Sequence, residues 1–185
     1  AFKILIILGV TITILTAYLS TVGLETNKFN NQIKEKISNL DERLDINLKT
    51  IKIILNPFKL ILEVKTIDPR INYQSKSLDI QNIKTQISIK SFIKGDFATK
   101  DLQISTKPIQ INNLITFARL IKNSPELFVL DKIIRSGYII VDLTLNFDQN
   151  GKVQEDFKIK GIVRDGEIKF LKKYNLNDID FIFNA

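Results

Sequence analysis

The hydrophobic positions of the chain form three patterns, and the first is a long, predominantly apolar run at the N-terminus. From Phe2 to Leu24, 13 of 23 residues are Phe, Ile, Leu or Val, and no charged residue occurs between Ile4 and Leu24. A helix needs about 20 predominantly apolar residues to cross a bilayer. We therefore expect a transmembrane anchor over residues 1–24.

A cleaved secretory signal is the alternative reading of the same run. The apolar core of a signal is typically about 7–15 residues long and ends at a small-x-small cleavage site. The run here is longer and the stretch Ser20–Gly23 matches such a site poorly, so a retained anchor fits better. Either segment would export the rest of the chain. Lys3 favours an N-terminus on the cytoplasmic side.

Helical spacing follows the anchor. Phe29, Ile33, Ile37 and Leu40 recur every three or four residues among polar ones, which predicts an amphipathic helix. We assign residues 25–40 to a linker helix that extends the anchor and packs its apolar stripe on the domain beyond it.

Alternation with a period of two begins at Leu44 and predicts β-strands. The phase of this alternation slips between Leu48 and Ile51. A slip of one residue would move the apolar side chains to the other face of the sheet, so we expect a β-bulge near Lys49-Thr50.

Turn signals divide the strands that follow. Asn56-Pro57 and Asp68-Pro69 interrupt the alternation, because proline cannot donate a hydrogen bond to a neighbouring strand. A long strand is then predicted over Leu78–Lys90, with a turn at Gly95-Asp96. A further strand contains Leu102 and Ile104 and ends at Pro108.

Helical spacing returns over residues 112–135, which we assign to a helical insert. Its apolar stripes are Leu114, Phe117, Ala118 and Ile121, then Leu127, Leu130 and Ile134. Ser124 suits the N-cap of the second helix and Pro125 its first position. We expect Gly137 to end the insert.

The C-terminal part alternates again. Ile139–Phe147 is a predicted strand, and Asp148–Gly151 is a hairpin signal. Further strands are predicted over residues 157–163, 168–170 and 176–183, with a turn at Asp165-Gly166. The pattern stops without a polar tail, and the chain begins without Met, so we expect a longer protein.

These patterns predict an α+β fold, with a transmembrane helix followed by a β domain over residues 41–185. Long strands with one apolar and one polar face are typical of an antiparallel sheet with one wet side. The insert can cover only part of the apolar face, and the rest would form an open groove for a hydrophobic ligand. Taken singly, each of these residues is far more typical of an ordinary closed core, and the groove prediction rests on the anchor, the one-faced strands and the lack of catalytic residues together. The groove candidates are Leu48, Ile53, Leu55, Leu62, Val64, Ile83, Ile87, Ile89, Leu102, Ile104, Ile139, Val141, Leu143, Leu145, Phe147, Phe157, Ile159, Val163, Phe181 and Phe183.

Composition argues against most chemical functions. Cysteine and histidine are both absent, which removes disulfides, thiolate chemistry and the commonest general base and metal ligand. The closest carboxylate clusters, Asp165/Glu167 and Asp178/Asp180, lie at turn or strand positions where a solvated face explains them. We expect no enzyme activity, no catalytic residue, no metal and no cofactor.

The formal net charge of +7 raises the question whether the surface of this chain binds nucleic acid or another acidic partner. Lys and Arg are scattered through the strands and not gathered in a stripe, so we expect no nucleic-acid partner. A basic surface can favour anionic lipid headgroups.

The order of these elements resembles the N-terminal part of the AsmA-like family of repeating β-groove envelope proteins. The resemblance is carried by the N-terminal helix, Leu44–Leu48 with Asn56-Pro57, Ile67–Ile71, Leu78–Ile80 through Ser91–Gly95, Lys160–Ile168 and Asn177–Phe181. Each motif is degenerate, and the resemblance rests on their order along most of the chain.

The resemblance implies a single-pass protein of the inner membrane, with the bulk of the chain in the periplasm. It implies a curved, open sheet that carries phospholipid between the inner and outer membranes, and an outer-membrane β-barrel or envelope protein as a possible partner. At 185 residues the chain would form only the membrane-proximal start of such a groove. Two alternatives stay open: a membrane-tethered assembly or scaffold factor for outer-membrane proteins, and an exported domain that encloses another hydrophobic ligand.

Overall fold

The computed structural model describes residues 2–39, 41–93, 99–148, 154–170 and 174–184. The helices are α1 (Phe2–Thr21), α2 (Asn30–Ser38), α3 (Ile89–Ile93), α4 (Ile111–Ile121) and α5 (Pro125–Ile133). The strands are β1 (Leu24–Thr26), β2 (Leu44–Asn47), β3 (Thr50–Asn56), β4 (Ile61–Ile67), β5 (Arg70–Tyr73), β6 (Lys76–Ser88), β7 (Thr99–Thr106), β8 (Ile109–Gln110), β9 (Ile134–Asn146), β10 (Lys158–Phe170) and β11 (Tyr174–Asn184).

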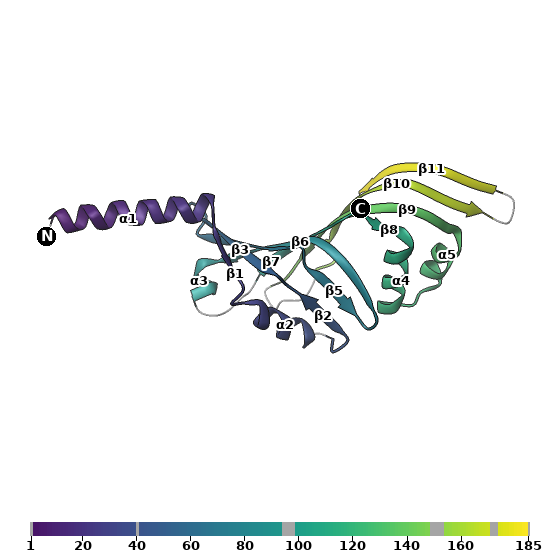
Figure 1. Ribbon diagram of the computed structural model, residues 1–185, viewed down its shortest axis with the longest axis horizontal. Helices are drawn as coiled ribbons and strands as arrows, with labels where there is room; N and C mark the ends of the chain where they lie inside the picture. Colours follow the sequence, from purple (N-terminus) through teal and green to yellow (C-terminus); the bar gives the residue numbers. More distant parts are fainter. Residues whose placement is uncertain (1, 40, 94–98, 149–153, 171–173, 185) are drawn as a thin grey trace.

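Helix α1 projects from the body of the molecule (Figure 1) and is long and apolar enough to cross a membrane. None of its residues is buried. The hydroxyls of Thr11, Thr13 and Thr21 donate to backbone carbonyls four residues earlier, at 2.8, 2.9 and 2.8 Å. Polar groups in hydrocarbon must be satisfied internally, and these bonds meet that requirement for the three threonines.

The chain leaves α1 at Thr21, three residues before the predicted end of the anchor. Gly23 adopts φ +78° and its N–H donates to the carbonyl of Tyr18 at 3.1 Å, which closes the helix. β1 then pairs with β3, and α2 starts separately at Asn30. The helix predicted over residues 25–40 is present as α2, but it does not continue the anchor, because β1 takes the first part of the segment into the sheet.

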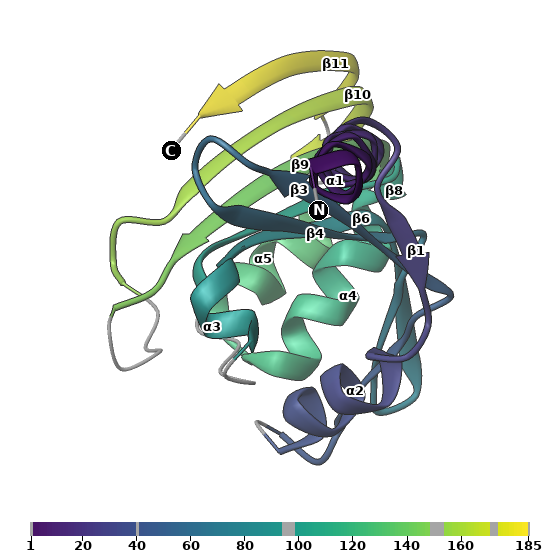
Figure 2. The ribbon, with the colours of Figure 1, turned by 90° about the vertical axis from the view of Figure 1, so that its left-hand side faces the viewer.

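The described strands form one 11-stranded sheet with antiparallel neighbours, whose main path is β1-β3-β4-β6-β7-β9-β10-β11. β5 lies between β2 and β6, and β8 pairs with β9. The sheet is not closed, and Figure 2 shows it curving around α4 and α5. An N-terminal apolar helix followed by a large, open antiparallel sheet agrees with the sequence prediction.

The bulge predicted near Lys49-Thr50 is a break between two strands. β2 pairs with β5 through Ile46 and Ile71, whereas β3 pairs with β4 through Ile51 and Thr66. The phase slip therefore reflects a change of neighbouring strand. The predicted interruptions at residues 56–57 and 68–69 are confirmed, because they separate β3 from β4 and β4 from β5. The turn expected at residues 95–96 lies outside the described residues.

Two predicted breaks in the C-terminal part fall inside strands. Gly137 belongs to β9, and Asp165-Gly166 belongs to β10. Asp165 has φ +51°, and the register of β10 shifts on both sides of Gly166, which marks a bulge. A Cβ at Gly137 would lie 3.0 Å from the Cα of Gly166, so glycine allows the two strands to approach at the bulge. The short strand predicted over 168–170 is the end of β10, and residues 149–151 of the predicted hairpin lie outside the described residues.

Helices α4 and α5 occupy the predicted insert and pack on the curved sheet. Ser124 caps α5 through its Oγ, which accepts a hydrogen bond from the Leu127 N–H at 3.4 Å, and Pro125 opens the helix as expected. The buried residues Ile111 and Ile115 of α4 meet Val163 of β10. Ile134, Ile139 and Phe183 pack around this cluster. One cluster of the core therefore lies between α4 and the last three strands, and other buried residues, such as Ile51 and Ile80, lie on β3 and β6.

Candidate apolar binding site

Most of the predicted groove residues share one face of the sheet. Residues directly opposite each other in an antiparallel pair project on the same side. Following the register from strand to strand gives rows of facing side chains. One row joins Ile53, Val64, Thr85, Leu102 and Leu145, a second joins Ile83, Ile104, Leu143 and Ile159, and a third joins Ile139, Val163 and Phe181. We call this side the apolar face.

The structure brings sixteen of the candidates onto the apolar face and leaves four elsewhere. Those on the face are Ile53, Leu55, Leu62, Val64, Ile83, Ile87, Leu102, Ile104, Ile139, Val141, Leu143, Leu145, Ile159, Val163, Phe181 and Phe183. Leu48 lies between β2 and β3, and Ile89 is the first residue of α3, not part of the predicted strand. Phe147 follows β9, and Phe157 precedes β10.

Coverage of the apolar face is uneven. Ile51 is fully buried and Ile87 is 6% exposed, whereas Phe181 at the edge is 48% exposed. Leu102, Leu143 and most other members are half-buried. Burial of the apolar face therefore varies along the sheet, and part of the face is accessible.

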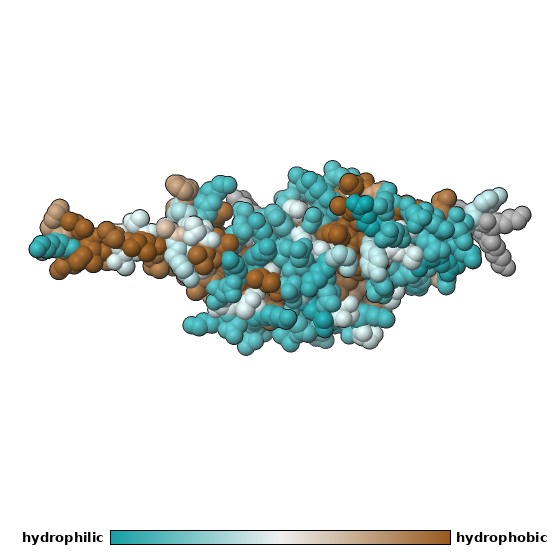
Figure 3. Space-filling model, turned by 45° about the horizontal axis from the view of Figure 1, so that its top comes forward, coloured by the Kyte–Doolittle hydropathy of each residue, from teal (hydrophilic) through white to brown (hydrophobic). Residues whose placement is uncertain are grey.

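The opposite face of the sheet is mainly polar. Lys84 and Glu63 form an ion pair there at 3.0 Å, and Lys160 lies opposite Asp142. The body seen in Figure 3 is largely hydrophilic, and hydrophobic surface gathers most evidently along α1. The two faces of the sheet thus differ sharply in polarity, as period-two alternation requires.

A pocket of about 410 Å³ lies on the apolar face between the α4–α5 hairpin and the last three strands. Its lining residues are Ile111, Leu114, Ile115, Ala118, Leu127, Leu130, Ile134, Ser136, Ile139, Val163, Gly166, Glu167, Ile168, Ile179, Phe181 and Phe183. Among the described residues of this lining, only Ser136 and Glu167 have polar side chains, and the Ser136 hydroxyl donates to Glu167 Oε2 at 3.2 Å. The volume lies within the range of small-molecule pockets, and the lining suits a hydrophobic ligand.

Sequence reasoning missed the helical wall of this pocket. The apolar stripes of the insert predict a cover for the sheet, whereas Leu114, Ala118, Leu127 and Leu130 line the pocket. Their helical spacing was visible in the sequence. Their position opposite β9–β11 depends on the tertiary packing, so no local signal identifies it.

Polar contacts join α4 to α5 near the middle of the hairpin and to the start of β9 at the N-terminal end of α4. Arg119 Nη1 of α4 donates to Asp131 Oδ2 of α5 at 2.5 Å, with both side chains mostly buried. The Arg119 guanidinium also lies 5.4 Å from the centre of the Phe128 ring. At the other end, Asn112 Nδ2 donates to the carbonyl of Arg135 at 2.9 Å. These contacts hold α4 and α5 as one hairpin over the pocket.

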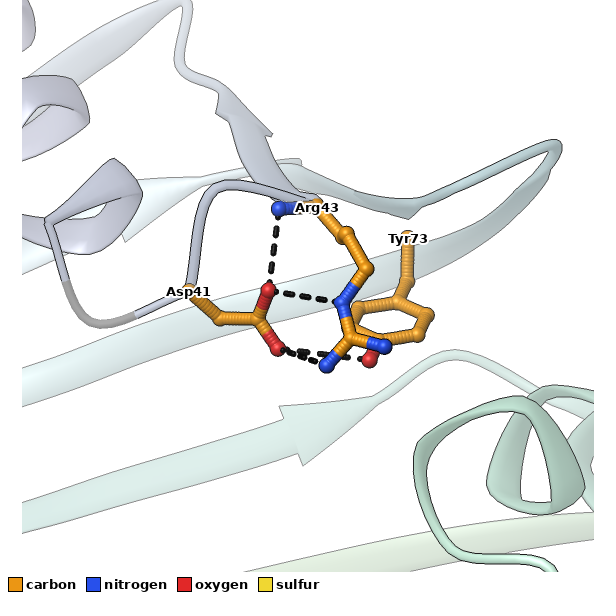
Figure 4. A network of polar contacts seen from close by, with 3 residues as sticks. All are labelled: Asp41, Arg43 and Tyr73. Atoms are coloured by element: carbon orange, nitrogen blue, oxygen red, sulfur yellow. Dashed lines mark hydrogen bonds and ion pairs between the residues drawn. The ribbon is translucent and has the colours of Figure 1, made fainter.

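A polar network of Asp41, Arg43 and Tyr73 (Figure 4) contacts α4 through the ring of Phe117. Both carboxylate oxygens of Asp41 accept hydrogen bonds from the Arg43 side chain, at 2.9 and 2.8 Å, and the Tyr73 hydroxyl donates to Asp41 Oδ2 at 3.2 Å. The bonds from Arg43 lower the pKa of Asp41 to about 2, and burial raises the pKa of Tyr73. The centre of the Tyr73 ring lies 6.3 Å from the centre of the Phe117 ring in an edge-on arrangement. Because Phe117 belongs to α4, this contact connects the network to that helix.

Asp180, from one of the carboxylate clusters noted in the sequence, has structural partners in β10. Asp180 Oδ1 accepts the backbone N–H of Asp165 at 2.9 Å, and Asp180 Oδ2 accepts from Arg164 Nη1 at 2.7 Å. The Asp165 N–H, followed by Arg164, lowers the pKa of Asp180. Asp180 therefore braces the β10 bulge. Within the described ranges, no group of three or more His, Cys, Asp or Glu residues could hold a metal ion.

Comparison with known proteins adds no assignment: no family model, curated protein or solved structure matches this chain.

Proposed function

We propose that this chain is a single-pass inner-membrane protein whose periplasmic β domain binds phospholipid acyl chains on its apolar face, and so helps phospholipid to pass between the inner and outer membranes. The observation that carries the proposal is the set of mainly apolar rows on one face of the sheet, in a chain that also has a helix able to cross a bilayer. The resemblance to the AsmA-like family points the same way.

The physical basis of the proposal is the cost of exposing an acyl chain. Each CH₂ group moved from a bilayer into water costs about 0.8 kcal/mol. Half-buried side chains such as Leu102, Ile104 and Leu143 offer a partly covered apolar path that offsets this cost. The pocket beneath α4 and α5 provides a place where a chain is enclosed, and the headgroup stays in water at the rim. This mechanism needs no catalytic residue.

Site-specific photocrosslinking in cells tests the lipid assignment. A benzophenone amino acid at Val141 or Ile159, on the apolar face, is expected to capture phospholipid. The matched controls are Asp142 and Lys160, which face each other on the opposite side of the same two strands. Because both controls are more exposed than the test positions, indiscriminate capture would favour them. Equal lipid capture on both faces, or capture of proteins alone, would reject the proposal.

Cysteine labelling tests the location separately. The chain has no cysteine of its own, so a single Phe58→Cys substitution gives one reactive thiol on a side chain that is 98% exposed. A membrane-impermeant maleimide added outside the inner membrane should modify this thiol in spheroplasts and leave Lys3→Cys unmodified. Labelling of position 3 alone would place the β domain in the cytoplasm.

A further inference from the structure

Three large apolar side chains are exposed at the end of the sheet beside α1. Phe58 and Leu60, in the turn between β3 and β4, are 98% and 64% exposed, and Ile93 at the end of α3 is 77% exposed. The Ile89 N–H donates to the carbonyl of Leu60 at 3.1 Å, so the start of α3 adjoins this turn. We call residues 56–60 together with α3 the proximal tip, and Figure 1 shows β3 and α3 at the end from which α1 projects.

The strand register explains why the proximal tip lies beside α1. β1 leads away from α1 and pairs antiparallel with β3, with Leu24 opposite Ile53. β3 therefore runs back towards α1, and its last residue, Asn56, lies three positions beyond Ile53. Since a strand rises about 3.3 Å per residue, the turn extends roughly 10 Å past Leu24. A Cβ at Gly23 would lie 2.7 Å from the Ile53 carbonyl oxygen, so glycine allows the end of α1 to pack closely on β3.

The turn that carries Phe58 has a defined geometry. The Lys59 N–H donates to Asn56 Oδ1 at 3.1 Å, and the carbonyl of Leu60 accepts the bond from α3. Leu60 has φ +52°, a left-handed conformation that is uncommon for a bulky residue. Such a conformation persists only where the surrounding structure holds it. The outward position of Phe58 therefore belongs to an ordered turn.

The charges of the proximal tip indicate what kind of surface it fits. Lys59 and Lys90 are exposed, and neither residues 56–60 nor residues 89–93 include an acidic residue. Apolar side chains among lysines are typical of segments that bind the surface of an anionic bilayer. A second copy fits less well, because it would bring the lysines of two tips together. Tyr18, half-exposed near the end of α1, suits the bilayer interface at the same end of the body.

We propose that the proximal tip inserts its three exposed apolar side chains into the surface of the bilayer that α1 crosses, where Lys59 and Lys90 bind anionic phospholipid headgroups. This inference rests on the anchoring role of α1 in the proposed function. A second contact beside the anchor fixes the orientation of the sheet and holds its apolar face at the bilayer surface. The thiol of Phe58→Cys stays accessible to aqueous maleimide, because cysteine lacks the inserting ring.

Tryptophan fluorescence tests the insertion, because the chain has no tryptophan of its own. The full chain with Phe58→Trp is placed in vesicles of phosphatidylethanolamine and phosphatidylglycerol that contain a nitroxide-labelled phospholipid. We expect a blue-shifted emission and the largest loss of fluorescence with the nitroxide near the headgroup, because interfacial segments lie about 5–10 Å into the boundary between headgroups and acyl chains. The matched control is Tyr138→Trp, because Tyr138 is 46% exposed and lies in the half of β9 farther from α1. It should keep its fluorescence.

A tryptophan within α1 separates failure of the proximal tip from failure of the anchor. Val10→Trp, in the middle of α1, should be quenched by a nitroxide deep in the acyl chains. If Val10→Trp is quenched while Phe58→Trp behaves like Tyr138→Trp, the tip proposal is overturned and the anchor stands. If Val10→Trp is not quenched either, both are rejected. A blue shift of Phe58→Trp without nitroxide quenching, which fades as the protein is diluted in the bilayer, would overturn the proposal by assigning the tip to a second copy.

Charge reversal tests the headgroup contact. Combined with Phe58→Trp, Lys59→Glu should reduce quenching in vesicles that contain phosphatidylglycerol and leave it unchanged in phosphatidylcholine alone. The matched control is Lys49→Glu, because Lys49 is also exposed but precedes β3 at the end away from α1. A loss of the same size with Lys49→Glu, or in phosphatidylcholine alone, would overturn the binding of anionic headgroups by the tip.

Discussion

The ring of Phe183 in β11 lies against the backbone of Gly161, its register partner in β10. A Cβ built at Gly161 would overlap Cζ and Cε1 of this ring and lie 3.0 Å from the carbonyl oxygen of Ile140. Glycine inside a strand has no side chain to pack and weakens it. Here the aromatic ring occupies the space that a side chain at position 161 would need, so the apolar face stays continuous across the two strands.

Gly161→Ala should therefore destabilise the β domain. The new methyl group forces the Phe183 ring out of its position, and overpacking of this kind typically costs about 1–3 kcal/mol. The free energy of unfolding, measured by urea titration in detergent micelles, is expected to fall by that amount. Gly9→Ala is the control, because a Cβ there has no neighbour within 4 Å. An equal, small effect of both substitutions would contradict this packing, and Phe183→Leu should partly restore the stability of Gly161→Ala.

The ion pair between Arg119 and Asp131 should be worth a measurable amount to the α4–α5 hairpin. Its side chains are 30% and 26% exposed, so solvent screens the pair only in part. A double-mutant cycle with Arg119→Met and Asp131→Leu is expected to give a coupling energy of about 1 kcal/mol. The exposed pair Arg70–Asp79, at 54% and 58% exposure, is the matched control and should couple more weakly. Equal coupling energies would mean that the partial burial of the Arg119–Asp131 pair adds nothing to its strength.

The cap of α5 offers an independent test of the same hairpin. Ser124 Oγ accepts the N–H of Leu127, so Ser124→Ala should lower the free energy of unfolding by about 1 kcal/mol. Ser124→Asp should retain most of the stability, since aspartate is also a favourable N-cap. Thermal unfolding followed by circular dichroism compares the two variants. If Ser124→Asp loses as much as Ser124→Ala, the hydroxyl contributes something other than a cap.

Much of the fold follows from local patterns in the sequence. The uncharged run after Lys3 predicted α1, and the alternation through Ile139–Leu145 predicted β9 and the face to which its apolar side chains point. Ser124 and Pro125 predicted the start of α5. Each of these signals acts within a few residues, so the sequence carries it directly.

Other features depend on contacts between distant segments. The phase slip before Ile51 was compatible with a bulge or with a change of partner strand, and only the pairing of β2 with β5 decides between them. Gly137 looked like a helix end, yet its role is to approach Gly166 across two strands. The pocket likewise required α4 to be placed over β10, which helical periodicity cannot specify.

The network around Asp41 predicts a specific loss of stability in acid. Its folded pKa of about 2 lies below the unfolded value of 3.8, because Arg43 stabilises the carboxylate. The contribution is therefore complete above the unfolded pKa and is lost as the pH falls from about 4 towards 2. Asp41→Asn should flatten the pH dependence of the free energy of unfolding in this window and leave the remaining slope from Asp45 and Asp180, whose pKa values are also lowered. Urea titrations at several pH values measure this slope. Glu42→Gln, at an exposed neighbouring carboxylate, is the control. An unchanged slope in Asp41→Asn would show that Asp41 has the same proton affinity in the folded and the unfolded chain.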